Sequence, residues 1–600
     1  MPEQLTLQTP DERDAALAAP RHELTDDSAT NETPPRNSPT HNLLRADAHT
    51  NISPLERERL KARAEIAAHY DRLAARRDEW RARNNYYHET VAALCRAVIP
   101  AGKSVLELGS GTGHLLASVR PREGVGVDLS LRMSELARRK HPQLNFIQAD
   151  AEQLPLARTF DYVIMSDLVG HLTDVWQTLR NLHHVCNPET RVVVTTYNFL
   201  WQPLLAAAER LGLKMPQPAQ NWLGVGDLEN LFRLADFRIE QSFTRLLVPA
   251  RVPVVGEWLN RLPQHNRLLS HFGLLNFFVL RPATNDEATR DAAMDREAAS
   301  REARGVVTGG EIDATPTRAQ SHVVSVVVPC RNEAGNIAAC VARVPSMGAR
   351  TEIVFVDGDS TDGTVEEIER EIERWRGVKE IKLIHQVPRG ETRREDDDAT
   401  SRDGGETRET RAANLMLKLG KGDAVRKGFA AAEGDVLMIL DADLTVPPED
   451  LPKFYDAIAS GKGQLINGTR LVYPLADQSM KSLNFLGNKF FSWLFTWLLS
   501  QRIKDTLCGT KVLRRADYER IVAARSHFGD FDPFGDFDLL FGAARLKLKI
   551  TELPVRYQRR TAGESKVRVL RHGWLLARMC IVGFLRLKAQ PWLARLRRRH

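Results

Sequence analysis

Cysteine is scarce in this chain of 600 residues, and its few cysteines are scattered. The six are Cys95, Cys186, Cys330, Cys340, Cys508 and Cys580, with no CxxC pair and no zinc-ligand spacing. This pattern argues against a disulfide framework and fits a reducing compartment. Apolar runs of about 18 residues are also lacking, which predicts no membrane-spanning helix. The N-terminus contains Glu3, Asp11, Glu12 and Asp14 but no apolar stretch, which excludes a secretory signal there.

Length and charge set broad limits on the protein. Six hundred residues exceed what one hydrophobic core supports and indicate about two to four domains. The net charge is +7, and the excess is uneven, because residues 561–600 hold ten Lys or Arg and one acid, Glu564. Such a basic, apolar segment can attach to anionic lipid. No nucleic-acid recognition motif accompanies it, so we expect no nucleic-acid partner.

Periodicity predicts an α/β fold class with two Rossmann-like domains. In residues 55–282, short apolar runs alternate with helical patterns, which is typical of βαβ units and a parallel sheet. The runs are residues 104–108, 124–127, 162–165 and 191–194. Residues 321–560 alternate in the same way.

The other segments have low apolar periodicity. Residues 1–54 predict a disordered tail, and residues 283–320 predict a linker. Inside the second domain, the highly charged residues 390–420 are either disordered or a functional flap.

The first domain contains a glycine-rich loop after its first apolar run. The loop reads Glu107-Leu-Gly109-Ser-Gly111-Thr-Gly113, and glycines there permit a tight turn and close approach of a ligand. His114 stands where a dinucleotide-binding fingerprint requires glycine. The next run ends at Asp128, about 20 residues on, where a carboxylate can accept both ribose hydroxyls.

These elements resemble the class I S-adenosylmethionine-dependent methyltransferases over about residues 84–282. The resemblance implies that Asp150 lies beside adenine and that Ser166 and Asp167 line the methionine side. The cofactor-binding residues that it implies are Glu107, Gly109, Gly111, Gly113, Asp128, Asp150, Ala151, Ser166 and Asp167. His171 is either a general base, since a neutral imidazole can accept a hydroxyl proton, or a residue that orders the loop. The methyl acceptor is not visible in the sequence.

An acidic pair is the most informative feature of the second domain. Asp441-Ala442-Asp443 follows the apolar run at residues 436–440. On a strand, residues i and i+2 share one side of the pleat, so we expect both carboxylates to point the same way. Two hard oxygen ligands suit Mg²⁺ or Mn²⁺ held against a diphosphate, which predicts a metal site at Asp441 and Asp443.

With two further strand ends, this motif resembles the inverting family 2 glycosyltransferases of the GT-A fold, over about residues 323–590. The strand ends are Ser325-Val-Val-Val-Pro329-Cys-Arg331-Asn-Glu333 and Ile353-Val-Phe-Val-Asp357-Gly-Asp359. The resemblance implies a nucleotide-sugar site made of Pro329, Arg331, Glu333, Asp357, Asp359, Lys421, Asp441, Ala442 and Asp443.

Within that family, the chain is most similar to the dolichyl- and polyprenyl-phosphate sugar transferases. The shared motifs are Asp441-Ala-Asp443-Leu-Thr445, Gly468-Thr-Arg470, Asp505-Thr-Leu-Cys-Gly509 and Gly563-Glu-Ser-Lys566. Thr445 stands where those enzymes usually carry Gln. The resemblance implies that Arg470 meets the acceptor phosphate and that Lys566 closes over phosphate, roles that suit both cations.

The acceptor decides whether the reaction needs a base. A lipid phosphate is already anionic near neutral pH, whereas a sugar hydroxyl would benefit from a carboxylate base. Asp505, Asp536 and Asp538 are the candidates. The alternative for Asp536 and Asp538 is a helix N-terminal charge.

Two segments predict contact with a membrane surface. Residues 483–500 contain six aromatics, including Trp493 and Trp497, and Trp-rich segments with a polar edge prefer the bilayer interface. Residues 573–587 are apolar but are broken by Arg578 and Arg586. The alternative for both segments is a helix packed on the transferase.

The sequence therefore predicts a bifunctional enzyme, cytoplasmic and peripheral at the inner face of the cell membrane. Its second domain would transfer a sugar from a nucleotide sugar to a polyprenyl phosphate with a divalent metal, and its first would methylate in the same glycoconjugate pathway. Two alternatives stay open: a transferase with a soluble saccharide acceptor, and a first domain that only binds or regulates.

Overall fold

The structure is a computed structural model that describes most of residues 54–590. The described residues are 54–218, 220–250, 259–260, 269, 271–284, 322–386, 420–470, 482–524, 535–556, 558, 560 and 569–590. The tail predicted at 1–54, the linker at 283–320, the segment 390–420 and Lys566 lie wholly or almost wholly outside them. Among the described helices, none is long and apolar enough to cross a membrane.

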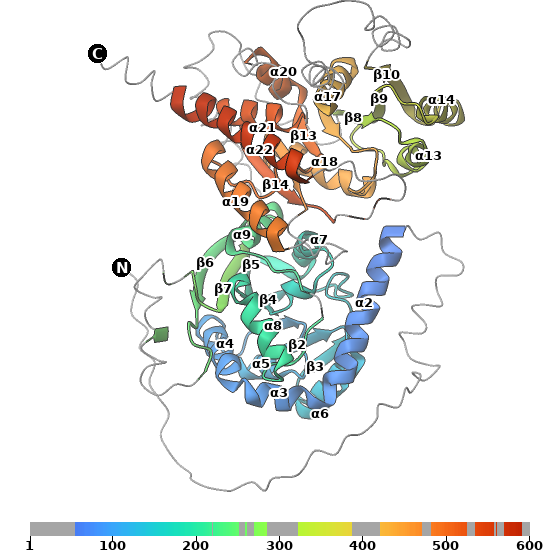
Figure 1. Cartoon of the computed structure of the whole chain (residues 1–600). Helices are drawn as coiled ribbons and strands as arrows, with labels where there is room; N and C mark the ends of the chain where they lie inside the picture. The colour runs from blue at the N-terminus through green and yellow to red at the C-terminus, as the bar shows by residue number, and fades with distance from the viewer. Residues whose placement is uncertain are drawn as a thin grey trace, which may run out of the picture. The chain divides into compact units, whose positions relative to one another are not determined.

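The first domain is a seven-stranded mixed sheet with strand order β3-β2-β1-β4-β5-β7-β6 (Figure 1). Its elements are α2 (Pro54–Leu73), η2 (Ala74–Arg76), α3 (Arg77–Arg83), α4 (Asn85–Val98), β1 (Ser104–Leu108), α5 (His114–Ser118), β2 (Glu123–Asp128), α6 (Leu131–Lys140), β3 (Asn145–Gln148), β4 (Phe160–Ser166), η3 (Val169–His171), α7 (Val175–Asn181), η4 (Leu182–Val185), β5 (Cys186–Tyr197), η5 (Phe199–Trp201), α8 (Gln202–Arg210), α9 (Val225–Leu234), β6 (Phe237–Arg245) and β7 (Leu275–Pro282). The strands β1 to β5 are parallel, as expected, and β7 is antiparallel to both its neighbours.

Alternate residues of the central strands build two cores, because successive side chains of a strand point to opposite faces. Val105 and Ile164 belong to the core that includes α4 residues such as Val91, whereas Leu106 and Val163 belong to the core that includes residues of α7 and α9. Helices therefore cover both faces, and only the strand ends remain open for a site.

The second domain is also a seven-stranded mixed sheet, with strand order β10-β9-β8-β11-β13-β12-β14 (Figure 1). Its elements are β8 (Val323–Cys330), α13 (Ala334–Arg343), β9 (Arg350–Asp357), α14 (Thr364–Arg374), β10 (Glu380–His385), α17 (Lys421–Ala431), β11 (Val436–Ile439), η6 (Pro448–Asp450), α18 (Leu451–Ala459), β12 (Leu465–Thr469), α19 (Ser482–Leu499), β13 (Lys511–Arg514), α20 (Arg515–Ala523), α21 (Asp536–Arg545), β14 (Ile550–Pro554), α22 (Val569–Gly583) and the π-helix η8 (Phe584–Ala589). The strands β10, β9, β8 and β11 are parallel, and β13 is antiparallel to both its neighbours.

Helix α19 is amphipathic in its described half. Phe495, Leu498 and Leu499 are buried in the core that includes residues of α21, and the Phe495 ring stacks on Phe537 at 5.3 Å. Trp493 and Trp497 are 66% and 47% exposed on the other side. The sequence left open whether this segment packs on the transferase or faces outward. In the structure one side of the helix is packed and the other side is exposed.

Candidate functional site

The glycine loop connects β1 to α5, and its three glycines have positive φ of 71°, 52° and 78° at Gly109, Gly111 and Gly113. A Cβ at Gly113 would lie 2.5 Å from the Phe146 ring, so this glycine serves packing. At Gly111 a Cβ would meet only Arg77 Nε, at 3.9 Å, so that stretch of backbone is open to a ligand.

Buried carboxylates hold this loop in place. Glu107 accepts a hydrogen bond from the backbone N–H of Leu116 at 3.0 Å, and burial raises its pKa to about 8. Asp128, at the end of β2, accepts from Gly111 N at 2.8 Å and from Ser130 N at 2.9 Å. Burial raises the pKa of Asp128, against the opposing effect of these two N–H donors.

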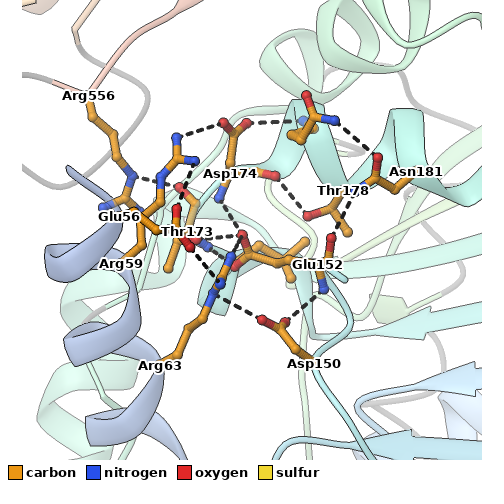
Figure 2. Close-up of polar contacts among 12 residues, drawn as sticks. Glu56, Arg59, Arg63, Asp150, Glu152, Thr173, Asp174, Thr178, Asn181 and Arg556 are labelled. Atoms are coloured by element: carbon orange, nitrogen blue, oxygen red, sulfur yellow. Dashed lines mark hydrogen bonds and ion pairs between the residues drawn. The ribbon is translucent and has the colours of Figure 1, made fainter. Parts of the chain in front are cut away.

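Asp150 belongs to a polar network that Figure 2 shows in close-up. Arg63 of α2 extends toward two acids, with its Nε 3.0 Å from Asp150 and its Nη2 3.1 Å from Glu152. Glu152 in turn accepts from the backbone N–H of Thr173 at 2.5 Å. The loop after β3, where adenine is expected, is thus held by a cation from a helix far earlier in the sequence.

The end of β4 is fixed from α4. Tyr87 donates to Asp167 at 2.9 Å, and Ser166 contacts Thr195 Oγ1 at 3.0 Å. Asp167 has a positive φ of 53°. Strain of this kind clusters at functional sites.

A cavity of about 330 Å³ brings most of the predicted cofactor residues together. Its lining includes Gly109, Gly111, Asp128, Asp150, Ala151, Ser166, Asp167 and His171. Glu107 and Gly113 do not line the cavity; their contacts with Leu116 and Phe146 hold the glycine loop in place. The lining also includes residues that sequence reasoning missed, namely Arg63, Tyr70, Arg77, Trp80 and Tyr87. They come from the helices before β1, where charge and helix propensity gave no sign of a site.

His171 lies in this cavity, and two polar side chains contact one of its ring nitrogens. Its Nε2 is 3.0 Å from the Tyr70 hydroxyl and 3.2 Å from Gln220 Nε2. Among the described residues its Nδ1 has no hydrogen-bond partner. Burial, helped by the Lys214 charge, lowers the pKa of His171 to about 4, so the imidazole is neutral near pH 7.

The lowered pKa of His171 predicts a pH dependence of stability. In the unfolded chain His171 has the ordinary pKa of 6.5 and is protonated below that pH. In the folded protein it stays neutral down to about pH 4. The free energy of unfolding should therefore fall as pH drops from 6.5 toward 4, by up to about 2 kcal/mol at pH 5 from this residue. Denaturant titrations at pH 7 and 5 should show a smaller fall in His171→Gln than in the exposed control His184→Gln. Equal falls would refute this.

In the second domain, the acidic pair lies just beyond β11 rather than on it. The strand ends at Ile439, and Asp441-Ala-Asp443 forms a turn followed by Leu444 with a positive φ of 52°. The expectation that strand alternation aligns the two carboxylates is therefore wrong, because the chain has already left the extended conformation. Both side chains are half-buried and each has its own cation.

Asp441 pairs with Lys421 at the start of α17, Oδ1 to Nζ at 2.5 Å. Burial alone would raise the pKa of Asp441, but the Lys421 charge holds it below its usual range. In return, the Asp441 carboxylate raises the pKa of Lys421. Gly509 leaves room for this pair, since a Cβ there would lie 2.0 Å from Asp441 Oδ2. Asp443 accepts from Thr445 Oγ1 at 2.8 Å and pairs with Arg560 at 2.9 Å.

The residues expected to hold the nucleotide lie at the ends of the parallel strands β8 and β9. Gly358 N donates to the carbonyl of Cys330 at 2.9 Å, which joins the two turns. The buried Asp357 accepts from the N–H groups of Asp359 and Ser360 at 3.2 Å. Glu333 accepts from Asn336 Nδ2 at 2.7 Å. Pro329 is the next-to-last residue of β8, and Arg331, just beyond the strand, is exposed.

Two of the three candidate bases are engaged in ion pairs. Arg470 forms a bidentate pair with Asp505, at 2.7 and 2.9 Å. Burial would raise the pKa of Asp505, but Arg470 holds it low. Asp536, which begins α21, pairs at 2.7 Å with the fully buried Lys511. This favours the structural alternative for Asp536, whereas Asp538 is half-buried in the first turn of the same helix.

Family models match both domains. The model for a methyltransferase domain matches residues 79–242, and the model for glycosyl transferase family 2 matches residues 325–390 and 416–521. The chain joins a methyltransferase to a family 2 glycosyltransferase. It is therefore an enzyme, and the two regions are called the methyltransferase domain and the glycosyltransferase domain below.

Curated relatives resemble parts of the chain. A dolichol-phosphate mannosyltransferase of Pyrococcus furiosus is 27% identical over 41% of this chain and 59% of its own length. That of Saccharomyces cerevisiae is 32% identical over 22% and 40%. An undecaprenyl-phosphate 4-deoxy-4-formamido-L-arabinose transferase of Edwardsiella ictaluri is 25% identical over 40% and 62%. The chain thus spans less than two thirds of the length of each.

Solved structures were also similar to this chain. A complex of the Trm112 activator with a methyltransferase from Haloferax volcanii matches at 20% identity and TM-score 0.29, over 36% of this chain and 98% of that one. A Thermotoga maritima methyltransferase matches at 17% identity and the same TM-score, over 36% and 99%. Scores this low carry no argument about function.

Both expected cofactors fit the residues present. The open backbone at Gly111, the half-buried acceptor Asp128 and the cavity suit S-adenosylmethionine. Asp441 and Asp443 offer the hard oxygen ligands that Mg²⁺ and Mn²⁺ prefer. Lys421 and Arg560 already balance the negative charges of Asp441 and Asp443. A metal ion bound there would therefore compete with these two side chains or share the carboxylates with them.

Proposed function

We propose that this protein transfers a sugar, with inversion, from a nucleotide sugar to a polyprenyl phosphate and methylates within the same pathway using S-adenosylmethionine. The observation that supports the acceptor most directly is the state of the carboxylates. Of the three candidate bases Asp505, Asp536 and Asp538, the first two are held in buried ion pairs, so neither of these two is free to take a proton from a sugar hydroxyl. A phosphate acceptor needs no such base, because it is already anionic near pH 7.

The side chains of the glycosyltransferase domain would bind and orient the nucleotide sugar and neutralise the charge of its diphosphate. Pro329, Glu333, Asp357 and Asp359 would hold the base and ribose, and Asp441 and Asp443 would face the diphosphate. A divalent cation bound there would stabilise the negative charge of the leaving diphosphate. Lys421 and Arg470 would add fixed positive charge near the reacting groups, which is where electrostatic stabilisation is most effective. The names of the polyprenyl-phosphate relatives support this acceptor.

In the methyltransferase domain, S-adenosylmethionine would supply an electrophilic methyl group. Asp128 would hold the ribose, Asp150 and Ala151 would flank the adenine, and Ser166 and Asp167 would line the methionine. His171, neutral near pH 7, would take the proton that a hydroxyl acceptor releases.

A transfer assay tests the proposal. Purified protein with Mg²⁺ or Mn²⁺ is offered a panel of nucleotide sugars and polyprenyl phosphate in detergent. Metal-dependent formation of a sugar lipid is the expected result. Transfer to a saccharide and none to the lipid would overturn the proposed acceptor and leave the glycosyltransferase.

We expect the exposed aromatics of α19 to bind anionic vesicles. Trp497 stacks on Phe584 at 5.9 Å, with Lys588 Nζ 5.6 Å from its ring, so aromatic and basic groups share one surface. Removing two such rings should weaken vesicle partitioning at least about tenfold. Sedimentation with phosphatidylserine vesicles should show this loss in Trp493→Ala/Trp497→Ala and normal binding in Val522→Ala, which removes another exposed apolar side chain. Unchanged sedimentation would remove this surface from the proposal.

A further inference from the structure

The exposed apolar side chains of the methyltransferase domain are concentrated in one place. Among its described residues, the large apolar side chains with the greatest exposure are Leu200, Leu204, Leu211, Leu213 and Phe272, at 43%, 61%, 73%, 62% and 58%. Four of them lie in η5, α8 and the turn after α8. Phe272 is joined to this segment, because its carbonyl accepts from Trp201 Nε1 at 2.8 Å. We call these five side chains the apolar rim. Exposed large apolar side chains gathered in one segment of a domain are typical of a binding surface.

The apolar rim is continuous with the cavity that holds the cofactor residues. Leu204 and Leu213 line that cavity, as do Trp201 and Met215 beside them. The turn carrying Leu213 is fixed to the junction of α3 and α4, since Asn84 Nδ2 donates to the Leu213 carbonyl at 3.3 Å. A ligand that lies on the rim can therefore reach the methyl site with its other end.

The inner end of this path is polar and cationic. Trp80 is 8% exposed and lines the cavity, and its Nε1 has no hydrogen-bond partner among the described residues. Lys214 lines the cavity with its Nζ 2.5 Å from Glu209 Oε1, and Arg77 of α3 lines it as well. The buried N–H donor of Trp80 and the Arg77 guanidinium suit an anionic, oxygen-rich head group.

We propose that the methyl acceptor is an isoprenoid-linked sugar phosphate whose head enters beside His171 and whose hydrocarbon chain lies on the apolar rim. The choice of an isoprenoid rests on the proposed function, because the glycosyltransferase domain would make such a lipid. The path from rim to cavity favours one amphiphilic molecule over a second protein copy, whose contact would stop at the surface.

Photolabelling of the full chain tests this. The probe is a 15-carbon isoprenyl phosphate with a diazirine in its chain, used below its micelle concentration with S-adenosylhomocysteine present. Digestion and mass spectrometry locate the label. We expect label within residues 199–215, reduced about tenfold in Leu204→Asp/Leu213→Asp, since a charge replaces each apolar contact. Val378→Asp, which changes an equally exposed apolar residue of the other domain, should label normally.

The position of the label separates the possible outcomes. Label only in the glycosyltransferase domain would overturn the acceptor inferred here and leave the proposed function standing. Label only at the rim would support the isoprenoid site at the rim but would count against polyprenyl phosphate as the sugar acceptor, and so against the glycosyltransferase domain as the source of this lipid. Rim label that persists in the aspartate variant, while calorimetry shows normal S-adenosylhomocysteine binding, would also refute the inference.

Discussion

Replacing Asp443 by alanine is expected to lower sugar transfer at least about 100-fold, the usual effect of removing one group that stabilises developing charge. The substitution removes a proposed metal ligand and the partner of Arg560 in one step. The loss should appear in kcat for sugar-lipid formation at saturating Mg²⁺ or Mn²⁺. Binding of S-adenosylmethionine should be unchanged, which shows that the chain is folded.

A matched control removes a carboxylate elsewhere in the same domain. Glu373 is exposed on α14, and among the residues that the structure describes its one ion pair is with a neighbouring surface arginine, Arg376. Such pairs contribute little to stability, so Glu373→Ala should retain full transfer. If Asp443→Ala were as active as this control, Asp443 would have no part in metal or diphosphate binding.

The second large effect is expected at Asp128 in the methyltransferase domain. Its carboxylate accepts the N–H groups of Gly111 and Ser130 and would accept the ribose hydroxyls. Charged hydrogen bonds of this kind contribute about 1.5–3 kcal/mol each, so Asp128→Ala should weaken S-adenosylmethionine binding about 10- to 100-fold or more.

Titration calorimetry with S-adenosylmethionine measures this directly. Glu135→Ala, an exposed position on the adjacent helix α6, serves as the control and should bind normally. Sugar transfer should survive in both variants. Normal affinity in Asp128→Ala would mean that the ribose is held elsewhere.

The strand framework and the acidic strand ends could be predicted from local sequence. Residues 436–440 are apolar without interruption and residues 104–108 are mostly apolar, because their strands are buried on both faces. Asp128 and Asp441 follow such runs directly, so their place at the open edge of a sheet was predictable. The antiparallel strands β7 and β13 were not, since direction depends on how distant segments return to the sheet.

The partners of the site residues could not be predicted. Arg63 reaches Asp150 from 87 positions away in the chain, and Arg560 reaches Asp443 across 117. Asp536 appeared to be a candidate base because local sequence shows its carboxylate but not the buried Lys511. Local patterns thus identify chemical groups, whereas tertiary contacts decide whether those groups are free to react.

The helices that precede β1 set the size of the smallest working methyltransferase unit. The family model begins at residue 79, yet Arg63 and Tyr70, on α2, form part of the cavity wall. A fragment cut at that boundary would keep the glycine loop and the whole sheet but would open one side of the cavity to water. Any attempt to separate the two transferases into independent proteins should therefore begin the first one at Pro54, 25 residues upstream of the recognisable domain.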